Sequence, residues 1–60
     1  MYAVFSRNIN NTLSVLFSGS YHECRKYIKN RLRQGLPTHF LHVARDTDRA
    51  RSMLRKRLGI

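Results

Sequence analysis

A segment with both a helix start signal and a helix stop signal occupies the middle of this chain, and it limits what the flanking segments can form. Ser20 and Glu23 match a capping box, in which the serine hydroxyl accepts from the N–H of Glu23 and the carboxylate reaches back to the N–H of Ser20. Gly35 suits the left-handed conformation that ends many helices, and Pro37 prevents further helix. Apolar residues recur at helical spacing between these signals, at Tyr21, Cys24, Tyr27 or Ile28, and Leu32.

The segment before this helix predicts a hairpin. Tyr2–Ser6 is aromatic and β-branched, as strands are. Asn8–Asn11 is rich in asparagine, which tolerates left-handed backbone angles and favours turns. Thr12–Ser18 then alternates, with apolar Leu13, Val15 and Phe17 expected on one face, Ser14 and Ser18 on the other, and Leu16 as the exception.

The segment after the helix predicts one strand and a second helix. Thr38–Arg45 contains the β-type residues Phe40, Leu41 and Val43. Asp46, Thr47 and Asp48 are all residue types that cap helix N-termini. Beyond them an apolar helical stripe follows, which Gly59 closes; it consists of Ala50, Met53, Leu54 and Leu58.

The predicted order ββαβα defines a small α+β domain. A right-handed crossover from the second strand through the central helix places the third strand beside the first and antiparallel to it. We therefore expect a three-stranded antiparallel sheet with the central helix on one face. The C-terminal helix covers the other face or packs on a second copy. If residues 38–44 are irregular instead, the pattern approaches that of ribbon-helix-helix dimers, although that family has one strand where this chain has a hairpin.

The chain has 60 residues and is expected to form one domain that is short for a self-sufficient core. A domain of this size buries only about 60% of the surface of its unfolded chain. The single cysteine, Cys24, excludes an internal disulfide. Because the surface of a second copy can complete a small core, we expect a homo-oligomer.

The charge balance is the strongest indication of function. Twelve Lys and Arg residues stand against three Asp and Glu residues, giving a formal net charge of +9. Most of these cations are arginines, whose planar donors suit phosphate. A solvated surface that only keeps the protein in solution is the plain alternative, but such an excess repels itself at a cost to stability. The sequence therefore predicts polyanion binding by cations on the exposed sides of the two helices: Arg25, Lys26, Lys29 and Arg33 on the first, and Arg51, Arg55 and Lys56 on the second.

No pattern for catalysis or metal binding stands out, and we expect no enzyme activity, cofactor or metal. His22 and Cys24 are two residues apart on a helix and do not face each other, and Cys24 lies on the apolar stripe. The three acids are all explained as helix-start residues. Expected on opposite faces of a strand, His39 and His42 do not have the paired spacing of zinc ligands. Acid–base cleavage of RNA by the histidines is a weaker alternative.

The sequence also bears on location and on base stacking. Met1–Phe5 lacks the basic lead-in of a secretory signal, and the longest apolar stretch, Leu13–Phe17, is far shorter than the roughly 20 residues that span a membrane. A lone cysteine fits a reducing compartment, so we expect a cytoplasmic protein without a membrane span.

Most aromatic residues fall on core faces, and Tyr21 and Tyr27 are the two expected to be available for stacking on bases.

The segment Phe17–Cys24 is a strand that runs into a capped helix. It resembles the openings of small phage proteins, and the short, basic chain without catalytic motifs is similar in style to accessory proteins of phages or mobile elements. The resemblance covers less than half of the chain, and it implies a regulatory or host-interaction role. Two hypotheses follow: a nucleic-acid-binding protein that acts in regulation or genome processing, with DNA and RNA both open, or a module that binds and modulates an acidic host or partner protein.

Overall fold

The computed structural model describes residues 1–60 and shows the predicted order of elements. These elements are β1 (Tyr2–Arg7), β2 (Leu13–Gly19), α1 (Tyr21–Arg33), β3 (Leu41–Arg45) and α2 (Asp48–Leu58). They form a three-stranded antiparallel sheet in the order β2-β1-β3, with β1 at its centre. The predicted α+β fold is therefore confirmed, and the ribbon-helix-helix alternative is wrong because β3 pairs with β1 along its whole length.

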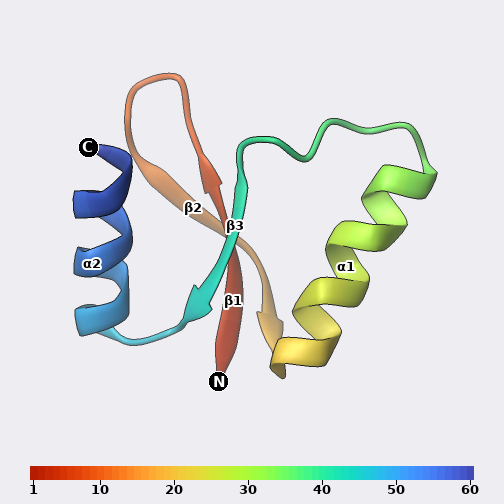
Figure 1. The fold of residues 1–60 in the computed structure, drawn as a ribbon, viewed down its shortest axis with the longest axis horizontal. Coiled ribbons are helices and arrows are strands. Elements are labelled where there is room, and N and C mark those ends of the chain that lie inside the picture. The colour runs from red at the N-terminus through yellow and green to blue at the C-terminus, as the bar shows by residue number, and fades with distance from the viewer.

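The two helices cover opposite faces of this sheet, as Figure 1 shows with the sheet between α1 and α2. Val4 and Leu41 on one face pack with Cys24 of α1 in a buried cluster. Ala3 and Phe5 on the other face pack with Leu54 of α2. Because side chains alternate along a strand, β1 supplies buried residues to both clusters. Of the two arrangements open to the second helix, the chain adopts the one in which α2 covers the remaining face.

Local signals fix the ends of both helices as expected. Both bonds of the Ser20–Glu23 capping box are present, and Gly35 beyond the end of α1 has a φ of 75°. Of the three candidate caps for α2, Thr47 accepts from the N–H of Ala50, and Gly59 closes the helix in the left-handed conformation. Asn11 in the hairpin turn also has a positive φ, as the asparagine-rich turn predicted.

The face expected for Phe17 is wrong because β2 contains a bulge. Val4 pairs with Phe17 and Phe5 pairs with Val15, so Leu16 has no partner in β1. The extra residue reverses the alternation from that point on. Leu13 consequently packs on the α2 side of the sheet, whereas Phe17 packs on the α1 side.

Two further expectations at the C-terminal end are corrected. β3 begins at Leu41, so residues 38–40 precede the strand and do not belong to it. Met53 was expected on the buried stripe of α2 but is 63% exposed, because this short helix packs on the sheet through Leu54 and Leu58 instead. No helix of the structure is both long enough and apolar enough to cross a membrane.

Candidate polyanion-binding surfaces

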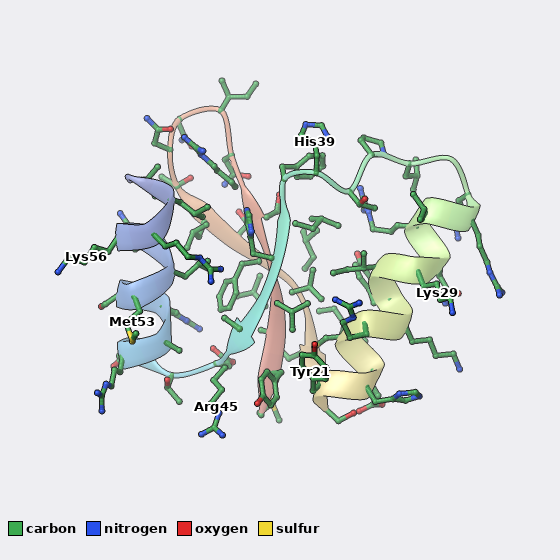
Figure 2. All side chains as sticks on the ribbon, in the orientation of Figure 1. Tyr21, Lys29, His39, Arg45, Met53 and Lys56 are labelled. Atoms are coloured by element: carbon green, nitrogen blue, oxygen red, sulfur yellow. The ribbon has the colours of Figure 1, made fainter.

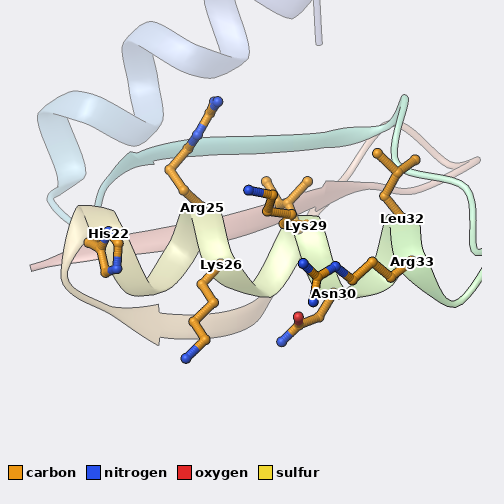
Figure 3. Close-up of a pocket in the computed structure, with 8 residues that line it drawn as sticks. His22, Arg25, Lys26, Lys29, Asn30, Leu32 and Arg33 are labelled. Atoms are coloured by element: carbon orange, nitrogen blue, oxygen red, sulfur yellow. The ribbon is translucent and has the colours of Figure 1, made fainter.

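Four cations form a row on the outer side of α1, here called the α1 row: Arg25, Lys26, Lys29 and Arg33. All four are exposed, as their helical spacing predicted. Figure 3 shows their side chains spreading from the helix surface, with the head groups of Arg25 and Lys26 pointing in opposite directions. Together with His22, Asn30, Ile28 and Leu32, they line an open hollow along the helix. The row therefore offers several separate cationic groups to one extended partner.

The charge of the α1 row is not neutralised within the protein. Glu23 is the one acid in α1, and its carboxylate accepts from the backbone N–H of Ser20 at 3.0 Å. This backbone bond, together with the bond to the Ser20 hydroxyl, lowers the pKa of Glu23 below its usual value. The single salt bridge of the structure joins Arg51 and Asp46, far from this row. None of the four cations is held in a salt bridge, although the charge of Glu23 acts on nearby Lys26, so the row remains open to an external anion.

Of the predicted cations of α2, one makes contacts within the protein and two are exposed without a partner. Arg51 pairs with Asp46, and its guanidinium lies 5.6 Å from the centre of the Phe5 ring. This side chain covers the core and is already paired with a carboxylate. Arg55 and Lys56 are exposed and without such a partner, and Figure 2 shows Lys56 pointing away from the sheet. Only part of the predicted α2 set is therefore available to a partner.

The structure does not bring the two predicted sets of cations together. Because α1 and α2 lie on opposite faces of the sheet, their outer sides face in opposite directions (Figure 1). The molecule measures 29 Å along its longest axis, which runs from one helix to the other in this view. A single molecule thus has two separate basic sides, of which α1 carries the more complete one.

The two tyrosines expected to be available for stacking differ in exposure. Tyr21 is 51% exposed and meets the ring of Tyr2 edge-on, with 5.3 Å between the ring centres. The guanidinium of Arg45 lies 5.8 Å from the centre of the Tyr2 ring. Tyr27 is instead stacked on Phe17 at 5.2 Å within the α1-side cluster, so the expectation for Tyr27 is wrong.

Residues of five segments form a second hollow that the sequence did not indicate. This hairpin-end hollow is lined by Arg7, Asn8, Ile9, Asn11, His39, Phe40, His42 and Leu58. The opposite-face argument for His39 and His42 fails here, because His39 precedes β3 and both histidines line the same hollow. No sequence motif could reveal this cluster, since it depends on the hairpin turn meeting the start of β3 and the end of α2.

The residues considered for catalysis and metal binding lie apart. Cys24 is fully buried, and its burial raises the pKa of the thiol. His22 is exposed on the surface of α1. No group of three or more His, Cys, Asp or Glu side chains lies close enough to hold a metal ion.

In comparisons with known proteins, no family model, curated protein or solved structure matched this chain. The argument for function therefore rests on the geometry and charge of the chain itself.

Proposed function

We propose that this protein is a nucleic-acid-binding protein without enzymatic activity, and that the α1 row is its principal contact with the phosphate backbone. The observation that carries the proposal is a row of exposed cations with no acid among them. Cations that neutralise phosphates release counterions, and this release drives sequence-independent binding. A regulatory or genome-processing role in the cytoplasm of a cell or an infected host fits such a protein.

The dimensions of the α1 row suit a polyanion. From Arg25 to Arg33 the helix rises about 12 Å, at about 1.5 Å per residue. Duplex DNA carries one negative charge per roughly 1.7 Å of its axis, or about seven over this length. Because about seven phosphates face only four cations, the number of ion pairs is limited by the cations. Each cation should therefore contribute separately to the binding free energy.

The test compares two triple variants of equal charge change. Arg25→Gln/Lys29→Gln/Arg33→Gln removes most of the α1 row, and Arg49→Gln/Arg55→Gln/Lys56→Gln removes three exposed cations of α2. Fluorescence anisotropy with labelled duplex DNA, single-stranded DNA and RNA is followed from low to moderate salt. The α1 variant should reduce the slope of log K against log salt by up to about 2.7 for duplex DNA, and the α2 variant should reduce it less.

Stability should hardly separate these variants, because an exposed charge contributes only about 0–1 kcal/mol to folding. Equal losses in both variants would mean that net charge, and not the α1 row, determines binding. Absence of binding of the unaltered protein to all three probes at low salt would refute the proposal.

One observation favours a second function, the binding and modulation of an acidic protein. Leu32 is 64% exposed beside the α1 row, and Leu36 just beyond the helix is 41% exposed. A protein partner can bury these leucines while its acids pair with the row, whereas a phosphate backbone gains little from them. Leu32→Gln should therefore weaken capture of an acidic protein from nuclease-treated lysate and leave nucleic-acid binding unchanged.

We also propose that the protein self-associates. Only seven of its 60 residues are buried, and β2 forms an open edge of the sheet. Val15 and Leu16 on that edge are 45% and 40% exposed. Unpaired backbone groups along an edge strand readily pair with another chain. Sedimentation at micromolar concentration should detect a dimer or larger species, and a single folded species of monomer mass would contradict this.

A further inference from the structure

The hairpin-end hollow has the composition of an anion site. Its volume is about 500 Å³, and it opens to solvent at the end of the sheet where the hairpin turn, the start of β3 and the end of α2 meet. Arg7 comes from β1, His42 from β3, and His39 from the loop before β3. Figure 2 shows His39 at this end of the molecule. Phe40 and Leu58 supply apolar wall between these polar groups.

Positive charge at this hollow has no acidic side chain to balance it. Arg57 of α2 and Arg7 both act on His42 electrostatically. The three acids of the chain belong to the first turn of α1, to the loop before α2 and to the first residue of α2, and Figure 1 shows these at the opposite end of the sheet.

The hydrogen-bonding groups of the hollow are only partly used. Arg7 donates to the side chain of Asn11 through a long contact of 3.4 Å, which leaves its other N–H groups free. No hydrogen bond involves the imidazole of His42, and the ring of His39 packs edge-on against Phe40. Partial burial, and then the charges of Arg57 and Arg7, lower the pKa of His42 below 6.5.

We propose that the hairpin-end hollow binds a single phosphate monoester group, held by Arg7 and His42, which both line it. A phosphate dianion supplies the negative charge that this cluster lacks, and its oxygens accept from the guanidinium group of Arg7 and from the imidazole of His42. Near such an anion the charged form of His42 is favoured, so phosphate binding takes up a proton at this ring. The site is separate from the α1 row, and it suits the terminal phosphate of a nucleic acid as well as free phosphate.

The direct test follows the three histidine rings by NMR while inorganic phosphate is added at constant ionic strength. The His42 resonances should move most, those of His39 less and those of the distant His22 least, and the pKa of His42 should rise with phosphate. Sulfate, which does not change protonation in this range, serves as the anion control. Equal movement of all three rings, or an unchanged His42, would overturn the proposal.

Variants assign the ligand groups. Arg7→Gln should weaken phosphate binding about tenfold, the change expected when one hydrogen bond to a charged group is lost. Arg57→Gln removes a charge that acts on His42 but no group that lines the hollow, so it should weaken binding less. Arg55→Gln has the same charge change two residues away on the exposed side of α2 and should have little effect. His42→Gln should remove the pH dependence that comes from the ring. If Arg55→Gln weakens binding as much as Arg7→Gln, the hollow is not a site but part of the general positive field.

Two oligonucleotides distinguish the sources of phosphate. A short single strand with a 5′-phosphate should shift His42, and the same strand without it should not, if the terminal group is bound. A shift with free phosphate alone would identify the free anion as the ligand. The triple variant of the α1 row should retain the phosphate response, so failure of backbone binding at α1 and failure of this site can be told apart.

Discussion

The backbone of α1 lies near all three strands of the sheet, whereas that of α2 lies mainly near β3 and its side chains Leu54 and Arg51 reach over to β1. On α1, Cys24, Tyr27 and Ile28 lie toward the sheet and the α1 row lies outward, with Leu32 exposed beside the row. On α2 an arginine, Arg51, takes part in covering the core by lying over Phe5. α1 thus leaves the four cations of the row to solvent, while its Arg31 is half-buried and donates to the carbonyl of Pro37, and α2 uses the long side chain of Arg51 to cover apolar surface.

The largest effect is expected where α2 meets the sheet, because α2 depends on few apolar side chains. Leu54 is 3% exposed and is the one buried residue of α2. Leu54→Ala should destabilise the protein by about 2–5 kcal/mol, which is a large part of the stability of a small domain. Denaturation followed by circular dichroism measures this. Ile28→Ala in half-buried surroundings on α1 should cost less, and the reverse order would contradict the comparison.

The capping residues give the next largest effect and again differ between the helices. Ser20 takes part in a reciprocal box of two bonds, at 3.0 and 3.1 Å, whereas Thr47 accepts a single bond from Ala50. Replacing a cap with alanine costs about 0.5–2 kcal/mol. Ser20→Ala removes only the bond that its hydroxyl accepts, because the backbone N–H that donates to Glu23 remains, so Ser20→Ala and Thr47→Ala should each fall within this range. The double variant Ser20→Ala/Glu23→Ala, which removes both bonds of the box, should cost more than Thr47→Ala in urea unfolding monitored by circular dichroism.

A substitution of Arg51 tests whether this cation of α2 contributes to the stability of the fold. Its ion pair and its position over Phe5 are both partly exposed to solvent, so Arg51→Gln should cost about 0.5–1 kcal/mol. Arg55→Gln on the exposed side of the same helix should change the free energy of unfolding by less than about 0.5 kcal/mol. Equal effects in thermal unfolding would show that Arg51 is only a surface charge.

The smallest expected effect is a pH dependence of the unfolding free energy that comes from Glu23 in α1. Bonds to Ser20 lower the pKa of Glu23 below 4.5 in the folded state. A carboxyl group with a lowered folded pKa contributes stability that is fully present above its unfolded pKa and is lost as the pH falls through the folded value. Stability should therefore decline on acidification below about pH 4.5. Glu23→Gln should flatten that part of the curve in denaturation measured from pH 6 to 2.

Much of the fold could be predicted because its signals are local. Ser20 and Glu23 determine where α1 begins, and Gly35 determines where it ends. The strand order follows from the handedness of the crossover connection. The exposure of the α1 row followed from helical periodicity alone. These features can be predicted without knowing which other segments pack against them.

The errors all concern residues whose environment is set by a distant segment. Met53 has the right spacing for the buried stripe, but the position of α2 along β3 leaves it exposed. Arg51 was taken for a free cation because its contacts with Asp46 and Phe5 depend on how α2 docks. His39 and His42 share a hollow only because β3 starts later than its sequence suggests.

The bulge in β2 has a consequence for changes in chain length. Leu16 lies between Val15 and Phe17 and has no partner in β1. The hairpin therefore corresponds to a regular antiparallel pair with one extra residue inserted in β2. Deleting Leu16 restores strict alternation and leaves Val15 and Phe17 on the faces that they already occupy. Deleting Ser14 instead would turn Leu13 toward the wrong face or shift the turn. A natural variant shorter by one residue in this strand should therefore have its gap at Leu16.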